Sequence, residues 1–253
     1  MVTRIPLIAG NWKMHGALPE AVALVEDLKS RLATVSDREI LIAPPFPALL
    51  RVAELLKDTR IVLGAQNLHW EEKGAFTGEV SGPMLRSVGC THVIIGHSER
   101  RQLFGETDES VALKMRAALR HQLTPILCIG ETLDERQANR TLAVIDRQTR
   151  VALAGLSAEE ADRLIIAYEP VWAIGTGKVA TPEQAQEVHH HLRSLVSEMA
   201  GAGVAARMRI LYGGSVKPDN IDVLMRQPDL DGALVGGASL NAADFARIVE
   251  FRS

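Results

Sequence analysis

The chain has 253 residues, of which 47% are hydrophobic and 23% charged, and 28 basic against 31 acidic side chains give a formal net charge of −3. This composition excludes a disordered, collagen-like or disulfide-dependent chain, because enough apolar residues are present to form a full-sized core. The slightly acidic balance, without a basic cluster, also argues against a nucleic-acid partner, which would need a positively charged face.

The N-terminal residues and the two cysteines bear on location. The apolar run within residues 1–10 is too short for a signal peptide, and no stretch approaches the roughly 18 apolar residues of a membrane span. We expect Cys90 and Cys128 to be reduced thiols. The sequence therefore predicts a cytoplasmic protein with no membrane partner.

Short apolar segments recur along the chain and predict its strands. They lack the alternating polar positions of a half-exposed strand, which is typical of parallel strands covered on both faces. The eight expected strands are residues 5–9, 39–43, 61–65, 92–95, 125–129, 164–168, 208–212 and 232–235.

Helical patterns lie between these segments. Apolar residues share one helix face in 20–32 and again in 108–119, where the face is expected to include Val111, Leu113 and Met115. Polar capping residues precede further helices and are Thr132, Thr181 and Asn241.

Eight strands that alternate with helices predict the architecture. Over about 250 residues this repeat matches a (β/α)8 TIM barrel, here a single domain spanning residues 1–253. The alternative is a doubly wound open sheet, but no G-x-G-x-x-G motif follows the first strand.

Glycine pairs follow the last two predicted strands. Gly213-Gly214 and Gly236-Gly237 stand at the carboxyl ends of strands, where barrels of this kind carry their functional loops. Glycine lets backbone N–H groups approach a ligand closely, and the loops after strands seven and eight frequently hold a phosphate. One pair alone is ordinary turn chemistry, but their joint position favours a phosphate site.

A glutamate and a long loop follow the sixth predicted strand. Glu169 would be desolvated at the apolar mouth of a barrel, which suits a general base, whereas an isolated strand-end glutamate is more often solvated or ion-paired. The loop after it has the features of a closing lid with hinges at 170–172 and 178–180, although static surface loops are commoner.

His97 and Lys13 follow the fourth and first predicted strands. His97 is the histidine best placed for acid–base chemistry, and Lys13 offers the local positive charge that the net charge does not. A hydrogen-bonded strand-end histidine and a surface lysine are the alternatives.

No metal site is expected. His189, His190 and His191 are consecutive on a predicted helix, where neighbouring side chains point about 100° apart and cannot converge on one ion. We interpret this run as a solvated helix face or an interface. Cys128 ends a strand without a partner at C-x-x-C spacing and is interpreted as a packed thiol.

Four segments together resemble the triosephosphate isomerase family. Asn-Trp-Lys-Met at 11–14, Gly-His-Ser-Glu-Arg-Arg at 96–101, the segment 168–177 and Tyr-Gly-Gly-Ser-Val at 212–216 occur in the family's order. The resemblance implies an enzyme of glycolysis and gluconeogenesis that interconverts dihydroxyacetone phosphate and glyceraldehyde 3-phosphate through an enediolate, without a cofactor.

The resemblance also implies a role for each matching residue. Glu169 would remove the carbon-bound proton, and His97 would polarise the carbonyl. Lys13 would stabilise the negative charge, and Asn11 would orient the substrate oxygen. The remaining residues that it implies are Ser98 and Glu99 as supports and Gly175, Ser215, Gly236 and Gly237 as phosphate ligands.

The loop at 66–79 resembles the segment by which subunits of this family contact one another. The residue at Thr77 would approach the partner's site, so the resemblance implies a homodimer. The sequence pattern alone would indicate only a long polar surface loop.

Two other functions stay open on the sequence. A Schiff-base aldolase would use Lys13 or Lys178 as its nucleophile. A non-catalytic phosphosugar-binding barrel would need the glycine turns but not a base, so the presence of Glu169 with His97 argues against it.

Overall fold

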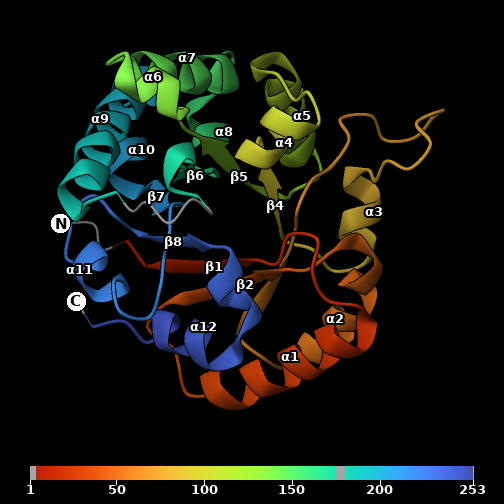
Figure 1. The fold of residues 1–253 in the computed structure, drawn as a ribbon. Helices are drawn as coiled ribbons and strands as arrows, with labels where there is room; N and C mark the ends of the chain where they lie inside the picture. The colour runs from red at the N-terminus through yellow and green to blue at the C-terminus, as the bar shows by residue number, and fades with distance from the viewer. Residues whose placement is uncertain (1–3, 175–179, 253) are drawn as a thin grey trace.

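The computed structural model describes residues 4–174 and 180–252. Within these ranges, eight parallel strands close into a barrel in chain order, with β1 also paired to β8. Figure 1 shows the helices arranged around the outside of this barrel. The strands are β1 (Leu7–Asn11), β2 (Glu39–Ala43), β3 (Ile61–Ala65), β4 (His92–Ile95), β5 (Thr124–Ile129), β6 (Ile165–Tyr168), β7 (Arg209–Tyr212) and β8 (Gly232–Val235).

The helices alternate with the strands, so the (β/α)8 prediction is confirmed. They are α1 (Leu18–Leu32), α2 (Leu49–Leu56), α3 (Gly82–Ser87), α4 (Ser98–Leu103), α5 (Asp108–Arg120), α6 (Leu133–Gln137), α7 (Thr141–Leu153), α8 (Ala158–Ala161), α9 (Pro182–Ala200), α10 (Ala202–Arg207), α11 (Ile221–Met225) and α12 (Ala242–Val249), with 3-10 turns η1 (Phe46–Ala48), η2 (Val171–Ala173) and η3 (Gly237–Leu240).

The first strand was predicted two residues too early, whereas the other seven agree within one residue. Pairing with β2 begins at Leu7, opposite Glu39, and not at Ile5. Ile5 is 60% exposed, and Pro6 has no N–H to contribute to a ladder. The apolar run therefore begins before the sheet does.

The strands bury both of their faces, which explains their unbroken apolar runs. Leu7 and Ala9 of β1 belong to the cluster inside the barrel, whereas Ile8 between them packs in the cluster beneath the helices. Cys128 lies in the inner cluster and is fully buried, and burial keeps the pKa of its thiol well above the usual value. The interpretation of Cys128 as a packed thiol is confirmed.

The predicted capping residues begin helices as expected. The side chain of Thr132 accepts a hydrogen bond from the Glu135 N–H, and that of Thr181 accepts one from the Gln184 N–H. Asn241 caps α12 in the same way. The expectation for Leu113 was wrong: it is 43% exposed, because it stands two residues from both Val111 and Met115 and so points away from their face.

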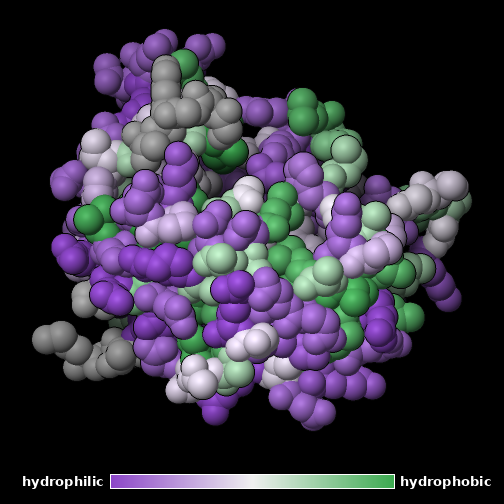
Figure 2. Space-filling view, turned by 60° about the horizontal axis from the view of Figure 1, so that its bottom comes forward, coloured by the Kyte–Doolittle hydropathy of each residue, from purple (hydrophilic) through white to green (hydrophobic). Residues whose placement is uncertain are grey.

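One face of the molecule is mostly polar (Figure 2). Hydrophilic residues predominate on the face shown in Figure 2, and hydrophobic residues form small separate patches between them. Among the described residues, no helix is long and apolar enough to cross a membrane.

Candidate active site

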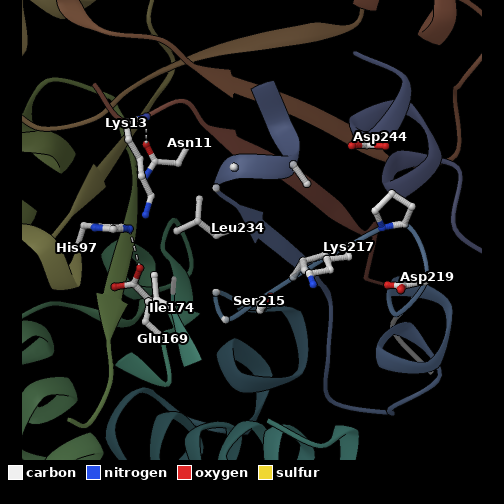
Figure 3. A pocket seen from close by; sticks show the side chains of 17 residues that line it. Asn11, Lys13, His97, Glu169, Ile174, Ser215, Lys217, Asp219, Leu234 and Asp244 are labelled. Atoms are coloured by element: carbon white, nitrogen blue, oxygen red, sulfur yellow. Dashed lines mark hydrogen bonds and ion pairs between the residues drawn. The ribbon is translucent and has the colours of Figure 1, made fainter. Parts of the chain in front are cut away.

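The carboxyl ends of the strands surround a pocket of about 700 Å³. Figure 3 shows its predicted acid–base residues on one side and the loop after β7 on the other. Seven of the predicted site residues line this pocket: Asn11, Lys13, His97, Glu169, Ser215, Gly236 and Gly237. The fold therefore brings together residues that are more than 220 positions apart in the chain.

The other predicted residues lie elsewhere. Ser98 and Glu99 line adjoining cavities and contact the pocket residues. Thr77 lies in the loop between β3 and α3, which projects away from the barrel at the right of Figure 1. Gly175, Lys178 and Val179, and with them most of the second predicted hinge, fall outside the described residues.

Glu169 follows β6 and is held with both carboxylate oxygens bound. Oε1 lies 2.8 Å from Nε2 of His97, and Oε2 accepts a hydrogen bond of 2.8 Å from the backbone N–H of Ser98. The residue is only 1% exposed. The expected desolvation of this carboxylate at the barrel mouth is therefore present.

His97 precedes α4 and caps it. Its Nδ1 accepts a hydrogen bond of 3.3 Å from the Glu99 N–H, which leaves the ring proton on Nε2, facing Glu169. Burial by itself lowers the pKa of His97, but the charge and hydrogen bond of Glu169 outweigh burial and raise it. Movement of Glu169 away from His97 would consequently favour the neutral imidazole.

Lys13 has a left-handed backbone, with φ of 52°. Such a conformation costs of order 1–3 kcal/mol for a residue other than glycine and needs support from its surroundings. Here the Lys13 N–H donates to Oδ1 of Asn11 at 3.0 Å, and the Gln66 side chain donates to the Lys13 carbonyl at 2.8 Å. The Lys13 ammonium lies 2.5 Å from Glu99.

Close packing requires glycine at both positions of the first pair and constrains the second pair less. A β-carbon at Gly213 would lie 2.9 Å from Cγ of Glu169, and one at Gly214 would lie 2.2 Å from the hydroxyl of Tyr212. A β-carbon at Gly236 would lie 3.2 Å from Cε of Lys13, whereas at Gly237 it would meet no atom within 4 Å. Larger residues would thus displace the base or crowd the lysine.

The first predicted hinge is attached to the barrel by Glu131, a residue that the sequence analysis missed. This fully buried carboxylate accepts hydrogen bonds from Nε1 of Trp172 at 2.9 Å and from the Tyr168 hydroxyl at 3.1 Å. Arg136 forms an ion pair with it at 3.2 Å. Its position two residues after β5 was the signal that could have revealed it.

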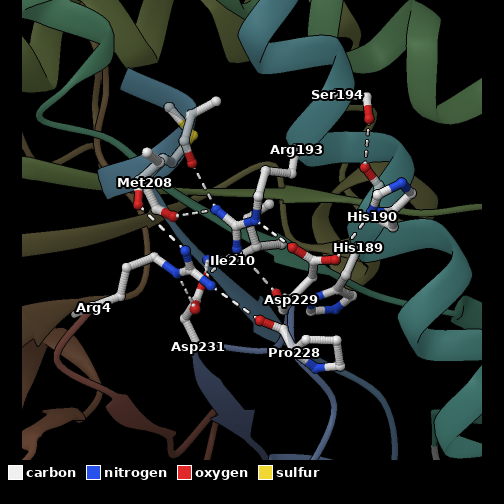
Figure 4. A network of polar contacts seen from close by, with 12 residues as sticks. Arg4, His189, His190, Arg193, Ser194, Met208, Ile210, Pro228, Asp229 and Asp231 are labelled. Atoms are coloured by element: carbon white, nitrogen blue, oxygen red, sulfur yellow. Dashed lines mark hydrogen bonds and ion pairs between the residues drawn. The ribbon is translucent and has the colours of Figure 1, made fainter. Parts of the chain in front are cut away.

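The three consecutive histidines have different environments: the interpretation as a solvated helix face is wrong for His189 and agrees with His190, whose side chain is 72% exposed. His189 is fully buried, and its Nδ1 lies 3.2 Å from the Asp229 carbonyl oxygen. His190 contacts the Asp229 carboxylate (Figure 4), and His191 contacts Asp146 on α7. The rotation of about 100° per residue turns His191 toward α7, whereas His189 and His190 reach different groups of Asp229, its carbonyl and its carboxylate.

A salt-bridge network surrounds His189 (Figure 4). Arg193 lies 2.6 Å from both the Asp229 and Asp231 carboxylates, and Arg4 lies 2.5 Å from Asp231. Among the described residues, no group of three or more histidine, cysteine, aspartate or glutamate side chains could hold a metal ion.

A closed (β/α)8 barrel with a buried glutamate–histidine pair, an adjacent lysine and glycine-rich rims defines an acid–base class of barrel protein. Residues 6–252 match the family model described as triosephosphate isomerase. Relatives named triosephosphate isomerase are 58% identical in Pelobacter propionicus (98% of this chain, 99% of the relative), 57% in Roseiflexus castenholzii (99% and 98%) and 56% in Chloroflexus aurantiacus (98% and 100%). The chain therefore belongs to the triosephosphate isomerase family.

Proposed function

We propose that this protein interconverts dihydroxyacetone phosphate and D-glyceraldehyde 3-phosphate, with Glu169 as the base and His97 as the electrophile. The observation that carries the proposal is the buried contact of 2.8 Å between their side chains, beside Lys13 in one pocket. The family and the names of its members support the choice of substrate.

The chemistry requires charge stabilisation as much as a base. A proton next to a carbonyl is weakly acidic, so its removal depends on donors that stabilise the oxyanion as it forms. The Lys13 ammonium and the Nε2–H of His97 are such donors. Because Glu169 occupies Nε2–H in this arrangement, the substrate carbonyl would take over that donor while the carboxylate turns to the carbon-bound proton.

Asn11 and the glycine turns complete the proposed site. Asn11, which already holds the Lys13 backbone, would orient the substrate oxygen. Backbone N–H groups of Ser215, Gly236 and Gly237, together with that of Gly175, would hold the phosphate. Since an enediolate can expel phosphate, exclusion of water by the loop after Glu169 would suppress a side reaction. No cofactor takes part in this scheme.

The contacts of Lys13 disfavour the aldolase alternative. A Schiff-base lysine must lose its proton easily, which requires an apolar or cationic neighbourhood. The Lys13 ammonium is instead paired with the Glu99 carboxylate at 2.5 Å, so its neighbourhood is neither apolar nor cationic. A phosphosugar-binding protein, for its part, would have no use for a buried carboxylate beside a histidine.

A coupled assay for glyceraldehyde 3-phosphate tests the proposal. Purified protein supplied with dihydroxyacetone phosphate is expected to form the aldose catalytically, and borohydride added with the ketose is expected to trap no lysine adduct. Absence of turnover would contradict the isomerase, and a trapped lysine adduct would favour the aldolase.

We also propose a homodimer. The loop that carries Thr77 is exposed over residues 71–79, and Phe76 within it is 43% exposed. Beside the active-site pocket lies a cavity of about 210 Å³ whose lining includes Met14 and Phe104, which are 94% and 67% exposed. The projecting loop of a second copy would fill this cavity and cover both apolar side chains.

We propose in addition that the protein is cytoplasmic. Cys90 and Cys128 are both free thiols and both buried. Unpaired cysteines are the usual state in a reducing compartment.

A further inference from the structure

Near the pocket, Gln148 binds both the N–H and the carbonyl of Gly130, which lies in the loop after β5. The Gly130 N–H donates to Oε1 of Gln148 at 2.8 Å, and Nε2 of Gln148 donates to the Gly130 carbonyl at 3.3 Å. Gln148 lies on α7 and is only 6% exposed. A buried side chain thus fixes the orientation of the backbone at Gly130.

Gly130 in turn packs directly against the backbone of Glu169. A β-carbon at 130 would lie 1.7 Å from the carbonyl oxygen of Glu169, so only glycine permits this approach. The ladder between β5 and β6 also continues past the strands here, since Glu169 N–H donates to the Ile129 carbonyl at 2.7 Å and Val171 N–H to the Glu131 carbonyl at 3.1 Å.

This ladder determines where the polar groups of Gly130 point. In a parallel pair, successive residues direct their N–H and C=O groups to opposite sides. Because Ile129 and Glu131 face the Glu169 segment, Gly130 faces away from it, and Gln148 takes the place of a neighbouring strand. A cavity of about 350 Å³ lies on this side and is lined by Gly130, Gln148 and Glu169.

We propose that Gln148 is a positioning residue for Glu169. Its amide fixes the backbone of Gly130, and the backbone of Glu169 packs against Gly130. The carboxylate of Glu169 is thereby held 2.8 Å from Nε2 of His97. The inference rests on the proposed role of Glu169. The side-chain amide of Gln148 supplies both the acceptor and the donor that this contact uses, whereas an ionised carboxylate supplies only acceptors and a thioether supplies no donor. Without it, water from the adjoining cavity would take over the polar groups of Gly130, and the loop would loosen.

The test compares Gln148→Glu and Gln148→Met with Gln186→Met. Glutamate keeps the shape and the acceptor of Gln148, whereas methionine keeps only the approximate shape. Gln186 is a matched control because its amide also makes two hydrogen bonds with a single residue, Asp229. Its Nε2 donates to the Asp229 carboxylate at 2.7 Å, and its Oε1 accepts from the Asp229 N–H at 3.1 Å. Both contacts belong to the salt-bridge network around His189. The control therefore has a comparable structural loss without a contact to the loop of the base.

Gln148→Glu and Gln148→Met are expected to lower kcat at least tenfold, with KM within about twofold of the wild-type value, because a displacement of about 1 Å at the base can cost 10²-fold. The deuterium isotope effect on kcat should increase, since proton transfer becomes slower. The inhibition constant of inorganic phosphate should not change. Without substrate, the proton resonance of His97 Nε2 should shift in both Gln148 variants and not in Gln186→Met.

A purely structural role of Gln148 would give another result. The melting temperature would fall while kcat, the isotope effect and the His97 resonance kept their wild-type values, as expected for Gln186→Met, and that result would overturn the proposal. Failure of the proposed function would be recognised separately, as a wild-type protein without isomerase activity. The His97 resonance would still test the positioning of Glu169.

Discussion

At the scale of single residues, the position of Glu169 is determined largely by backbone groups. Its own N–H is bound to Ile129, its Oε2 to the N–H of Ser98, and its Cγ lies against Gly213. Such contacts restrict the carboxylate to a small region beside His97. The reach of the side chain from this fixed backbone then decides whether it meets the substrate proton.

Shortening that side chain should therefore reduce the rate more than binding. Glu169→Asp withdraws the carboxylate by about one methylene, and a displacement of about 1 Å can cost 10²-fold. We expect kcat to fall by two orders of magnitude or more with little change in KM, as steady-state kinetics with both triose phosphates would measure. As a control, Glu26→Asp, at an exposed position on α1, should keep the wild-type kcat. An unchanged kcat in Glu169→Asp would contradict its role as the base.

At the scale of elements, α9 fixes a neutral histidine in the protein interior. Burial lowers the pKa of His189 to about 3, although Asp229 contributes a hydrogen bond that opposes this shift. A second buried histidine, His92 on β4, has its pKa lowered to about 4 by the same cause. Both remain neutral in the folded protein at pH values where an unfolded chain would protonate them.

The sign of the resulting pH dependence follows from these shifts. A histidine whose pKa is lowered on folding contributes stability above its unfolded value of 6.5, and this contribution is lost as the pH falls toward the folded value. Each such histidine adds up to about 1.4 kcal/mol per pH unit to the slope of the unfolding free energy.

His189→Gln should therefore reduce this slope. Denaturant unfolding of the wild type and the variant between pH 6 and pH 4 is expected to give a shallower decrease for His189→Gln, although the variant is less stable at neutral pH. His15→Gln, which changes an exposed ring, should keep the wild-type slope. Equal slopes for the wild type and His189→Gln would show that His189 is not kept neutral by burial.

At the scale of the whole molecule, the barrel and its central residues could be predicted because they have local signals. Burial on both faces produces apolar runs, and residues directly after such runs, such as Glu169 and His97, gather at one end of the barrel. The contacts of Gln66 and Gln148 have no local pattern, because their partners belong to other elements. The burial of His189 was not predicted for the same reason, because its contacts with Asp229 and Tyr168 exist only in the folded chain.

The proposed association of two copies is the property of the whole molecule that can be tested most directly. Phe104 lies at the edge of the cavity beside Lys13 and is 67% exposed, so an interface there would bury it. A charge introduced at this position would have to be desolvated in the interface, which costs several kcal/mol. Phe104→Glu should consequently shift the protein from dimer to monomer.

Sedimentation velocity would measure this shift against the chain mass of 27.5 kDa. The wild type is expected at about twice that mass, and Phe104→Glu at about that mass. Leu50→Glu changes another exposed apolar residue, 60% exposed on α2 and outside this cavity, and should remain dimeric. A monomeric wild type would contradict the homodimer, and a dimeric Phe104→Glu would place the interface elsewhere. If the monomer also loses kcat, the partner's loop supports the site in addition to covering it.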